Sequence, residues 1–179
     1  EVIHHFVDGG AHTYHVVTAG DPSHPAIVFA HGFPETWFAF HHQMAALSDS
    51  YFCLAFDLKG FGQSAHPTRE ESDYDYAHCA TEWVELIDAL ELDRFFLVAH
   101  ERGVVIADHL CAIEGMAERI SGYERMQQSG NRPHGEPRPP HEFFHSRDAV
   151  PIFESGPLTE LAYGSDTRPD GSPPLVHAP

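Results

Sequence analysis

Basic residues are scarce in this 179-residue chain. Ten Lys and Arg stand against 27 Asp and Glu, for a formal net charge of −17, and Lys59 is the only lysine. Such a surface repels phosphates, so nucleic acid and anionic membranes are poor partners for it. Sixteen histidines, if all were protonated, would cancel sixteen of these seventeen charges. The composition therefore predicts low solubility near pH 5.

Cysteine and long apolar runs are also lacking. Cys53, Cys79 and Cys111 lie far apart and form no CxxC pair, so neither a disulfide framework nor a cysteine-based zinc site is indicated. There is no run of ~18 apolar residues and no basic stretch leading into an apolar one, as in a secretory leader. We expect a cytoplasmic protein without a membrane span, a metal or a cofactor.

Composition divides the chain into two unequal parts. Ten of the 14 prolines fall between Ser129 and Pro179, whereas residues 1–127 alternate short apolar runs with amphipathic stretches. We expect a folded core over 1–127, and a proline-rich segment over 128–179 that is either cap-like or an irregular tail.

The first part follows a regular alternation of strand and helix patterns. A hairpin is expected around Asp8–Gly10, because its glycines permit a tight turn. Apolar runs typical of buried strands are Ala26–Ala30, Tyr51–Phe56, Phe95–Ala99 and, more weakly, Ile120–Met126. Helical stripes are formed by Trp37, Phe40, Met44 and Leu47, by Ala80, Val84, Ile87 and Leu90 or Glu91 with Trp83 beside them, and by Ile106, Leu110, Ile113 and Ala117. This pattern predicts an α/β fold with a mostly parallel sheet, an N-terminal hairpin and flanking helices.

In such sheets, sites form where strands end and helices begin, and the chain has three such junctions. His31–Trp37 reads HGFPETW, Asp57–Ser64 reads DLKGFGQS, and Ala99–Gly103 reads AHERG. The second has neither the third glycine nor the GK[ST] of a phosphate loop, so a structural turn is the favoured interpretation.

The third junction has the pattern of a nucleophile elbow. Small residues at Ala99 and Gly103 permit a strained turn that raises the central side chain above the sheet. The N–H groups at the start of the next helix then face that side chain. Here the raised residue is the carboxylate Glu101. The His100-Glu101 pair also begins an HExxH zinc motif, but Val104 ends the match.

Together the three junctions resemble the α/β-hydrolase superfamily, in the branch of epoxide hydrolases and haloalkane or haloacetate dehalogenases. The resemblance covers residues 1–127, and residues 133–153 resemble the start of that branch's cap. It implies an attack by the elbow carboxylate on a small-molecule substrate, giving an ester that an activated water hydrolyses.

The resemblance also assigns roles to residues of this chain. Glu101 takes the nucleophile position, and the backbone N–H groups of Phe33 and Arg102 form the oxyanion hole. The Arg102 side chain and Trp37 bind substrate, Arg102 by pairing with a carboxylate. His31, Gly32 and Pro34 support the loop.

The chain departs from the branch at three places. Glu101 stands where aspartate is usual, and its extra methylene moves the carboxylate by ~1.5 Å. A reacting group that is misplaced by ~1 Å can lose ~10²-fold in reaction rate. A second substrate arginine is replaced by Val105, and no tryptophan follows the nucleophile. No acid or base is assigned: Glu124 and Gln127 lie near the expected acid position, and the downstream histidines (His134, His141, His145 and His177) follow no recognisable strand.

Three hypotheses stay open. The first is a carboxylate-nucleophile hydrolase acting on an epoxide, a haloacid or an ester-like molecule. The second is a non-catalytic relative or fragment whose open sheet edge pairs with another chain or a second copy. The third is a lyase or isomerase that uses Glu101 as a base. Under the second, the Phe95–Ala99 strand and the Ile106 stripe are expected to lose part of their cover, giving marginal stability.

Overall fold

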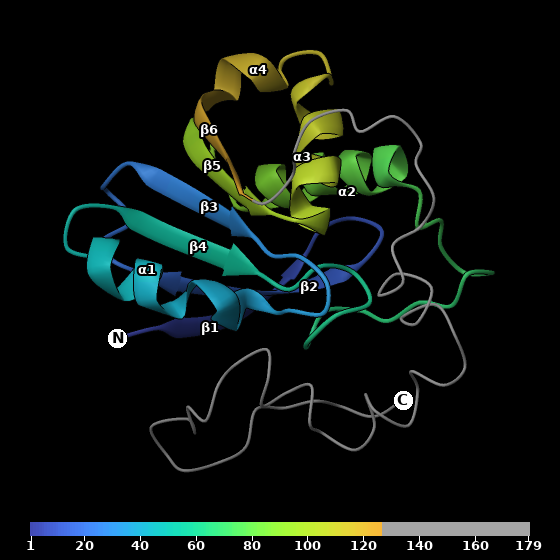
Figure 1. Ribbon diagram of the computed structural model, residues 1–179, viewed down its shortest axis with the longest axis horizontal. Helices are drawn as coiled ribbons and strands as arrows, with labels where there is room; N and C mark the ends of the chain where they lie inside the picture. Colours follow the sequence, from blue (N-terminus) through green and yellow to red (C-terminus); the bar gives the residue numbers. More distant parts are fainter. Residues whose placement is uncertain (127–179) are drawn as a thin grey trace, which may run out of the picture. The chain divides into compact units, whose positions relative to one another are not determined.

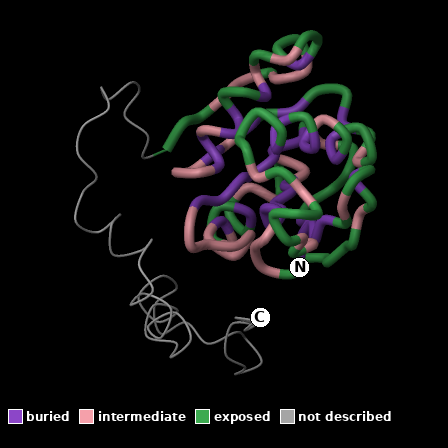
Figure 2. The backbone as a smooth tube through the Cα atoms, turned by 90° about the vertical axis from the view of Figure 1, so that its right-hand side faces the viewer, coloured by how far each residue is buried: buried purple, intermediate pink, exposed green. Residues whose placement is uncertain are grey.

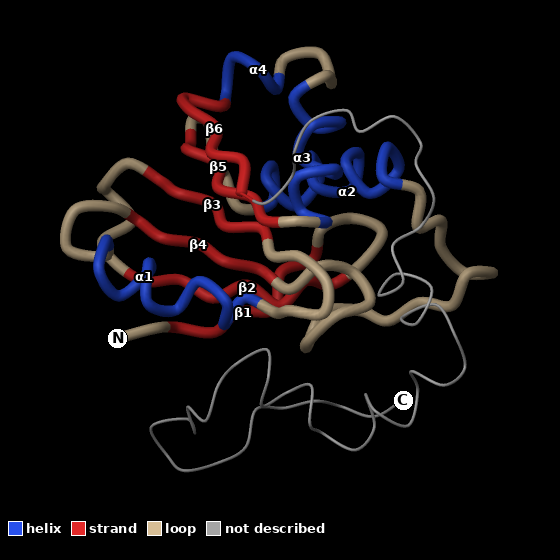
Figure 3. The backbone as a smooth tube through the Cα atoms, viewed as in Figure 1, coloured by secondary structure: helices blue, strands red, loops and turns tan. Residues whose placement is uncertain are grey.

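A computed structural model of the chain describes residues 1–126, which form a six-stranded sheet with helices on both faces (Figures 1 and 3). The strand order is β1-β2-β4-β3-β5-β6. The strands are β1 (Ile3–Asp8), β2 (Thr13–Ala19), β3 (Ala26–Ala30), β4 (Phe52–Phe56), β5 (Phe95–His100) and β6 (Ile120–Met126). Pairs β1–β2 and β2–β4 are antiparallel and the other three are parallel. The α/β fold with a mostly parallel sheet and an N-terminal hairpin is confirmed.

Five helices connect these strands. They are the 3-10 helix η1 (Trp37–Phe40), α1 (His41–Leu47), α2 (Tyr76–Ala89), α3 (Arg102–Cys111) and α4 (Met116–Arg119). In β3, Val28 packs in a cluster with α2 and α3, whereas Ile27 and Phe29 pack in a cluster with α1. Because side chains alternate along a strand, α1 covers one face of the sheet, and α2 and α3 cover the other (Figure 1).

The central strands are buried on both sides, as their uniform apolar sequence predicts. All five residues of β3 are buried, and exposed positions lie toward the outside of the fold (Figure 2). Cover on both faces is typical of parallel sheets in α/β proteins. The β3 and β5 ends, which carry two of the junctions, lie side by side in parallel register, with Ala30 opposite Ala99.

Two helical predictions need correction. The pattern predicts one helical stripe from Ile106 through Leu110 and Ile113 to Ala117, but α3 ends at Cys111. Ala117 belongs to the separate helix α4, which follows Gly115 at φ +83°. In α2 the buried face is centred on Trp83, which is 2% exposed, and not on Val84 beside it.

The predicted loss of cover around β5 holds for Phe96 but not for most of the side chains it named. β6 pairs with β5, and Phe95, Leu97, Ala99, Ile106 and Leu110 are all buried. The large apolar side chains exposed there are Phe96, which belongs to the predicted strand, and Met126. Phe96 lies on the opposite sheet face from Phe95 and Leu97, beyond the reach of α2 and α3.

Some predictions fall outside the described residues. They are the cap-like or irregular segment 128–179, Gln127 and the four downstream histidines. Within residues 1–126, no helix is both long and apolar enough to cross a membrane, and no group of three potential metal ligands converges.

Candidate active site

Glu101 occupies a sharp turn between β5 and α3, as the elbow pattern predicts. Its φ is +45°, a region that non-glycine residues enter at a cost and mostly at functional sites. A Cβ on Gly103 would lie 2.6 Å from the Ala30 carbonyl oxygen and 2.7 Å from that of His31. Those atoms are backbone and cannot move aside, so only glycine permits α3 to start this close to β3.

The Glu101 carboxylate lies against two backbone N–H groups from different segments. Its Oε2 accepts hydrogen bonds from the Phe33 N–H (2.9 Å) and the Arg102 N–H (2.6 Å). The structure therefore brings together the three residues predicted to form the nucleophile and its anion-binding donors. Gly32 makes room for them, because a Cβ there would lie 2.6 Å from the Glu101 Cβ.

His31 fixes the start of the β3–η1 loop (His31–Thr36). It is buried, its Nδ1–H donates to the Gly32 carbonyl (2.8 Å), and its Nε2 accepts from the Leu58 N–H (2.9 Å). These bonds require a neutral ring with its proton on Nδ1, and burial lowers the pKa of His31. The next residues complete the turn, with a cis bond between Phe33 and Pro34. The supporting role of His31, Gly32 and Pro34 stays a prediction, and the bonds of His31 are those that such a role requires.

A second acidic residue, Glu35, lies in the same loop and was missed at the level of sequence. Its Oε2 accepts from the Gly32 N–H (3.0 Å) and from His100 Nδ1 (2.7 Å). Burial disfavours the Glu35 charge, but the bonds from His100 and Gly32 outweigh it, and the pKa lies below its ordinary value. Position offered the only signal, since Glu35 closes the HGFPE motif and His100 precedes Glu101.

The Arg102 guanidinium lies among aromatic rings. Its central carbon is 5.7 Å from the ring centre of Phe33, 5.6 Å from that of Phe61 and 6.0 Å from that of Tyr76. Such cation–π contacts hold a cation without neutralising it. Within residues 1–126 the guanidinium has no carboxylate partner, whereas Arg119 and Arg125 each pair with an aspartate.

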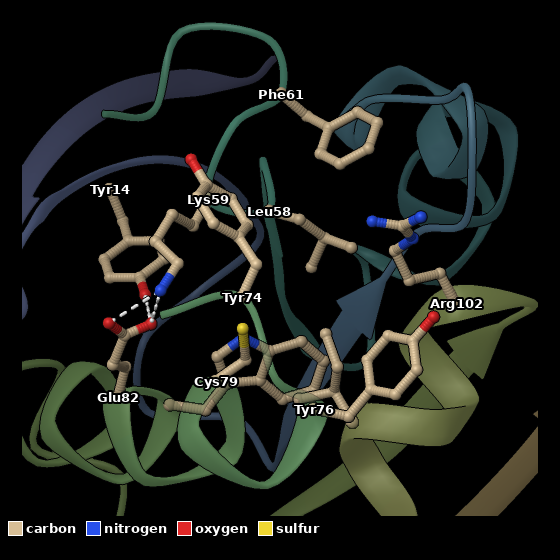
Figure 4. Close-up of a pocket in the computed structure, with 11 residues that line it drawn as sticks. Tyr14, Leu58, Lys59, Phe61, Tyr74, Tyr76, Cys79, Glu82 and Arg102 are labelled. Carbon is tan, nitrogen blue, oxygen red and sulfur yellow. Dashed lines mark hydrogen bonds and ion pairs between the residues drawn. The ribbon is translucent and has the colours of Figure 1, made fainter. Parts of the chain in front are cut away.

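Arg102 also lines a narrow cleft beside the elbow, with Phe61, Tyr76 and Lys59 on its walls (Figure 4). Lys59 differs from Arg102 in being fully paired: its Nζ lies 2.7 Å from a buried Glu82 oxygen and donates to the Asp73 carbonyl (2.6 Å). Of the two cations that line this cleft, Arg102 is the one without a carboxylate partner among residues 1–126.

Trp37 lies at the far end of the β3–η1 loop. Its backbone N–H donates to Asp57 Oδ1 (2.8 Å), and its ring packs edge-on against His4 and Phe38. The structure gives no contact between this ring and Glu101 or Arg102, so a role in binding substrate stays a prediction.

The second junction forms a tight turn closed around the Asp57 carboxylate. Gly62, at φ +53°, has no room for a Cβ beside that carboxylate, and the Gln63 N–H donates to Oδ2 (2.9 Å). The geometry agrees with the structural interpretation of the two glycines.

The sheet order, the elbow and the loop facing it are matched by a known family. The model of the alpha/beta hydrolase fold family matches residues 25–123. The chain belongs to the α/β-hydrolase fold family. Its match spans β3 to β6 and includes all three junctions.

Over this N-terminal part the α/β-hydrolase chain is epoxide hydrolase-like. It is 41% identical over 98 residues to epoxide hydrolase 2 of Siraitia grosvenorii, covering 54% of this chain and 30% of that protein. It is 34% identical over 120 residues to epoxide hydrolase A of Mycobacterium tuberculosis, covering 62% and 37%. The crystal structure of epoxide hydrolase VrEH1 from Vigna radiata superposes with a TM-score of 0.71 at 27% identity, covering 94% of this chain and 56% of that one. The chain therefore spans well under half the length of these two curated relatives.

Proposed function

We propose that this chain is a hydrolase in which Glu101 attacks an electrophilic carbon of a small molecule. The observation that carries the proposal is that one oxygen of the Glu101 carboxylate, Oε2, accepts hydrogen bonds from both the Phe33 and the Arg102 N–H groups. This leaves Oε1 for attack. Neither N–H group can then bind a substrate carbonyl without displacing Glu101, so a saturated carbon is a better target than an ester.

The first step is a displacement. A lone pair of Glu101 Oε1 forms a bond to the carbon, and the bond from that carbon to its leaving atom breaks, with the electron pair going to an epoxide oxygen or a halide. The product is an ester of Glu101 and the substrate carbon. An epoxide oxygen then takes up a proton, whereas a halide leaves as the ion.

The second step uses the same two N–H groups. When water adds to the ester carbonyl carbon, negative charge develops on Oε2, the atom that Phe33 and Arg102 already hold. Donors aimed at a developing anion stabilise it most where water is excluded. The bond between the carbonyl carbon and Oε1 then breaks, and the departing alkoxide takes up one proton of the added water. The other proton passes to solvent, and the Glu101 carboxylate is regenerated. The two N–H groups are in this proposal the oxyanion hole.

Arg102 selects the substrate in this proposal. Its guanidinium is held by rings but has no acidic partner within the described part of the chain. A planar fork of N–H donors suits a carboxylate. We therefore favour substrates that carry a carboxylate beside the reactive carbon, such as haloacids or epoxy acids.

The proposal is tested by covalent labelling. Incubation of the folded full-length chain with a haloacid or epoxy acid is expected to add the mass of the substrate residue to the peptide that contains Ala99–Gly103. Glu101→Gln removes the nucleophile and is expected to abolish the adduct. Arg102→Met, which keeps an unbranched side chain but removes the charge, is expected to slow labelling by the acids more than labelling by a neutral epoxide.

The outcomes separate the three hypotheses. An adduct that accumulates supports the nucleophile and indicates that water activation needs groups from another chain or segment. An adduct that turns over makes the chain a complete hydrolase. Labelling that survives Glu101→Gln, or a folded chain that is never labelled, removes Glu101 as nucleophile. Deuterium exchange into an acidic C–H substrate would then favour Glu101 as a base.

A further inference from the structure

Asp57 is a buried carboxylate that the proposed chemistry does not use. It follows β4 and is 1% exposed. Its Oδ1 accepts from the Trp37 N–H (2.8 Å), while its Oδ2 accepts from the Gln63 N–H (2.9 Å) and from His15 Nδ1 (2.8 Å). A buried charge is costly unless it is paired and hydrogen-bonded, and here each partner comes from a different segment of the chain.

The segment after β4 holds the β3–η1 loop at both ends. At the start of the loop, the Leu58 N–H donates to His31 Nε2 (2.9 Å). Just beyond its end, the Trp37 N–H donates to Asp57 Oδ1. Phe33, whose N–H meets the Glu101 carboxylate, lies between these anchors. The adjacent residues Asp57 and Leu58 therefore fix both ends of the stretch 31–37, which presents the Phe33 N–H to Glu101.

The anchor at Asp57 is the stronger of the two. A hydrogen bond to an ionised carboxylate is shorter and about twice as strong as one between neutral groups. The turn also leaves room for this carboxylate, because Gly62 places no side chain beside it.

We propose that Asp57 is a positioning residue, which holds the Phe33 N–H against the Glu101 carboxylate by fixing Trp37. Without this anchor the loop keeps its His31 end and the Glu35–His100 bond but loses its fixed point at Trp37. The consequence for reaction rate rests on the proposed function of Glu101, whereas the position of the Phe33 N–H does not. Two independent measurements therefore separate the two proposals.

The first measurement is the amide resonance of Phe33. The sequence contains two Gly–Phe pairs, Gly32-Phe33 and Gly60-Phe61. Labelling glycine with ¹³C at the carbonyl and phenylalanine with ¹⁵N therefore yields two filtered amide signals from the full chain. Phe61 donates to the Leu58 carbonyl (2.9 Å) within its own turn. Glu101→Gln moves the Phe33 signal and thereby identifies it.

Asp57→Asn keeps the shape of the side chain but not its capacity to accept. Trp37 and Gln63 donate to different carboxylate oxygens, and an amide has only one oxygen, so one of these N–H groups loses its acceptor. Asp57→Ala removes both acceptors. The matched control is Ser64→Ala, which removes a hydroxyl that donates to the Asp57 backbone carbonyl and accepts from the His15 N–H (2.9 Å). It leaves the carboxylate and the Trp37 N–H intact, so it controls for general loosening of the turn.

A second pair of variants keeps the test decisive if the Asp57 variants fail to fold. Trp37 is the first residue of η1, and Thr36 before it is extended (φ −139°, ψ −179°), so proline fits at position 37. Trp37→Pro removes both the N–H that donates to Asp57 and the indole ring. Trp37→Ala removes the ring alone.

We expect the Phe33 signal to move upfield in Asp57→Ala and Trp37→Pro, and to stay near its wild-type position in Ser64→Ala and Trp37→Ala. A Phe33 signal that is unchanged in folded Asp57→Ala or Trp37→Pro overturns the proposal and leaves Asp57 with a role in stability alone.

The second measurement is the rate of Glu101 labelling. Because ~1 Å of misplacement costs ~10²-fold in a well-aligned reaction, we expect Asp57→Ala to slow labelling ~10- to 10²-fold at a temperature where the variant is folded. Ser64→Ala is expected to label at the wild-type rate, and equal slowing in both variants contradicts a specific role for Asp57. If the wild-type chain is never labelled, the proposed function fails, while the Phe33 signal still decides the positioning role.

Discussion

At the scale of single residues, His31 links the candidate site to pH. Its ring is neutral in the folded chain, because Nε2 must accept from the Leu58 N–H, and burial lowers its pKa from the ordinary 6.5. The unfolded chain therefore binds a proton below pH 6.5 that the folded chain does not. By linkage, the free energy of unfolding is unaffected above that pH and falls as the pH drops below it.

We predict that His31 alone contributes a slope of about 1.4 kcal/mol per pH unit below pH 6.5, down to its folded pKa. His31→Gln retains hydrogen-bonding capacity but does not titrate, so denaturant unfolding between pH 5 and 7 is expected to show a shallower dependence for this variant. His109→Gln is the control, because His109 is exposed at the end of α3. Equal slopes for wild type and His31→Gln contradict the prediction.

The residues that meet at the elbow differ in how far sequence reveals them. Glu101, Phe33 and Arg102 were predictable because each occupies a fixed place in a short motif. The bond between Glu35 and His100 joins residues 65 positions apart, and only the parallel register of β3 and β5 brings them together. The same holds for Asp57, whose glycine-rich surroundings indicated a turn but not its hydrogen bond to Trp37.

At the scale of elements, α2 shows the limit of periodicity. A stripe through Ala80, Val84 and Ile87 and one through Cys79, Trp83 and Leu86 are both helical in spacing, and the sequence does not rank them. Packing decides, since the Trp83 ring meets Phe56 edge-on with centres 5.1 Å apart. The end of α3 was not predicted for a related reason. The apolar spacing continues to Ala117, although the helix ends at Cys111 and Gly115 has a left-handed backbone conformation.

We predict that Trp83→Ala lowers the free energy of unfolding by about 3–5 kcal/mol, as is typical for a fully buried aromatic ring. Val84→Ala is the matched control, since the same helix carries it at a partly buried position, and its loss is expected to be smaller. Chemical unfolding of both variants measures the difference. A greater loss in Val84→Ala would contradict the observed orientation of α2.

At the scale of the whole molecule, histidine protonation governs charge. The chain carries −17 at neutral pH and 16 histidines. Net charge far from zero keeps proteins apart in solution, and its loss promotes association. We predict that solubility falls sharply between pH 7 and pH 5, as measured by the protein left in solution after centrifugation. A flat profile across this range would contradict the prediction, and recovery on returning to pH 7 distinguishes charge loss from unfolding.

The Glu101 carboxylate is also the N-cap of α3, because its Oε2 accepts from the first N–H of that helix. An alkyl ester is neutral and a weaker acceptor, so the proposed esterification of Glu101 would also weaken the helix that follows it. Loss of a capping group costs about 0.5–2 kcal/mol. The modified chain is therefore expected to melt at a lower temperature than the free one, with faster amide hydrogen exchange in the first turn of α3. Amide hydrogen exchange in the first turn of α3 would thus indicate whether the Glu101 side chain is a free carboxylate or an ester.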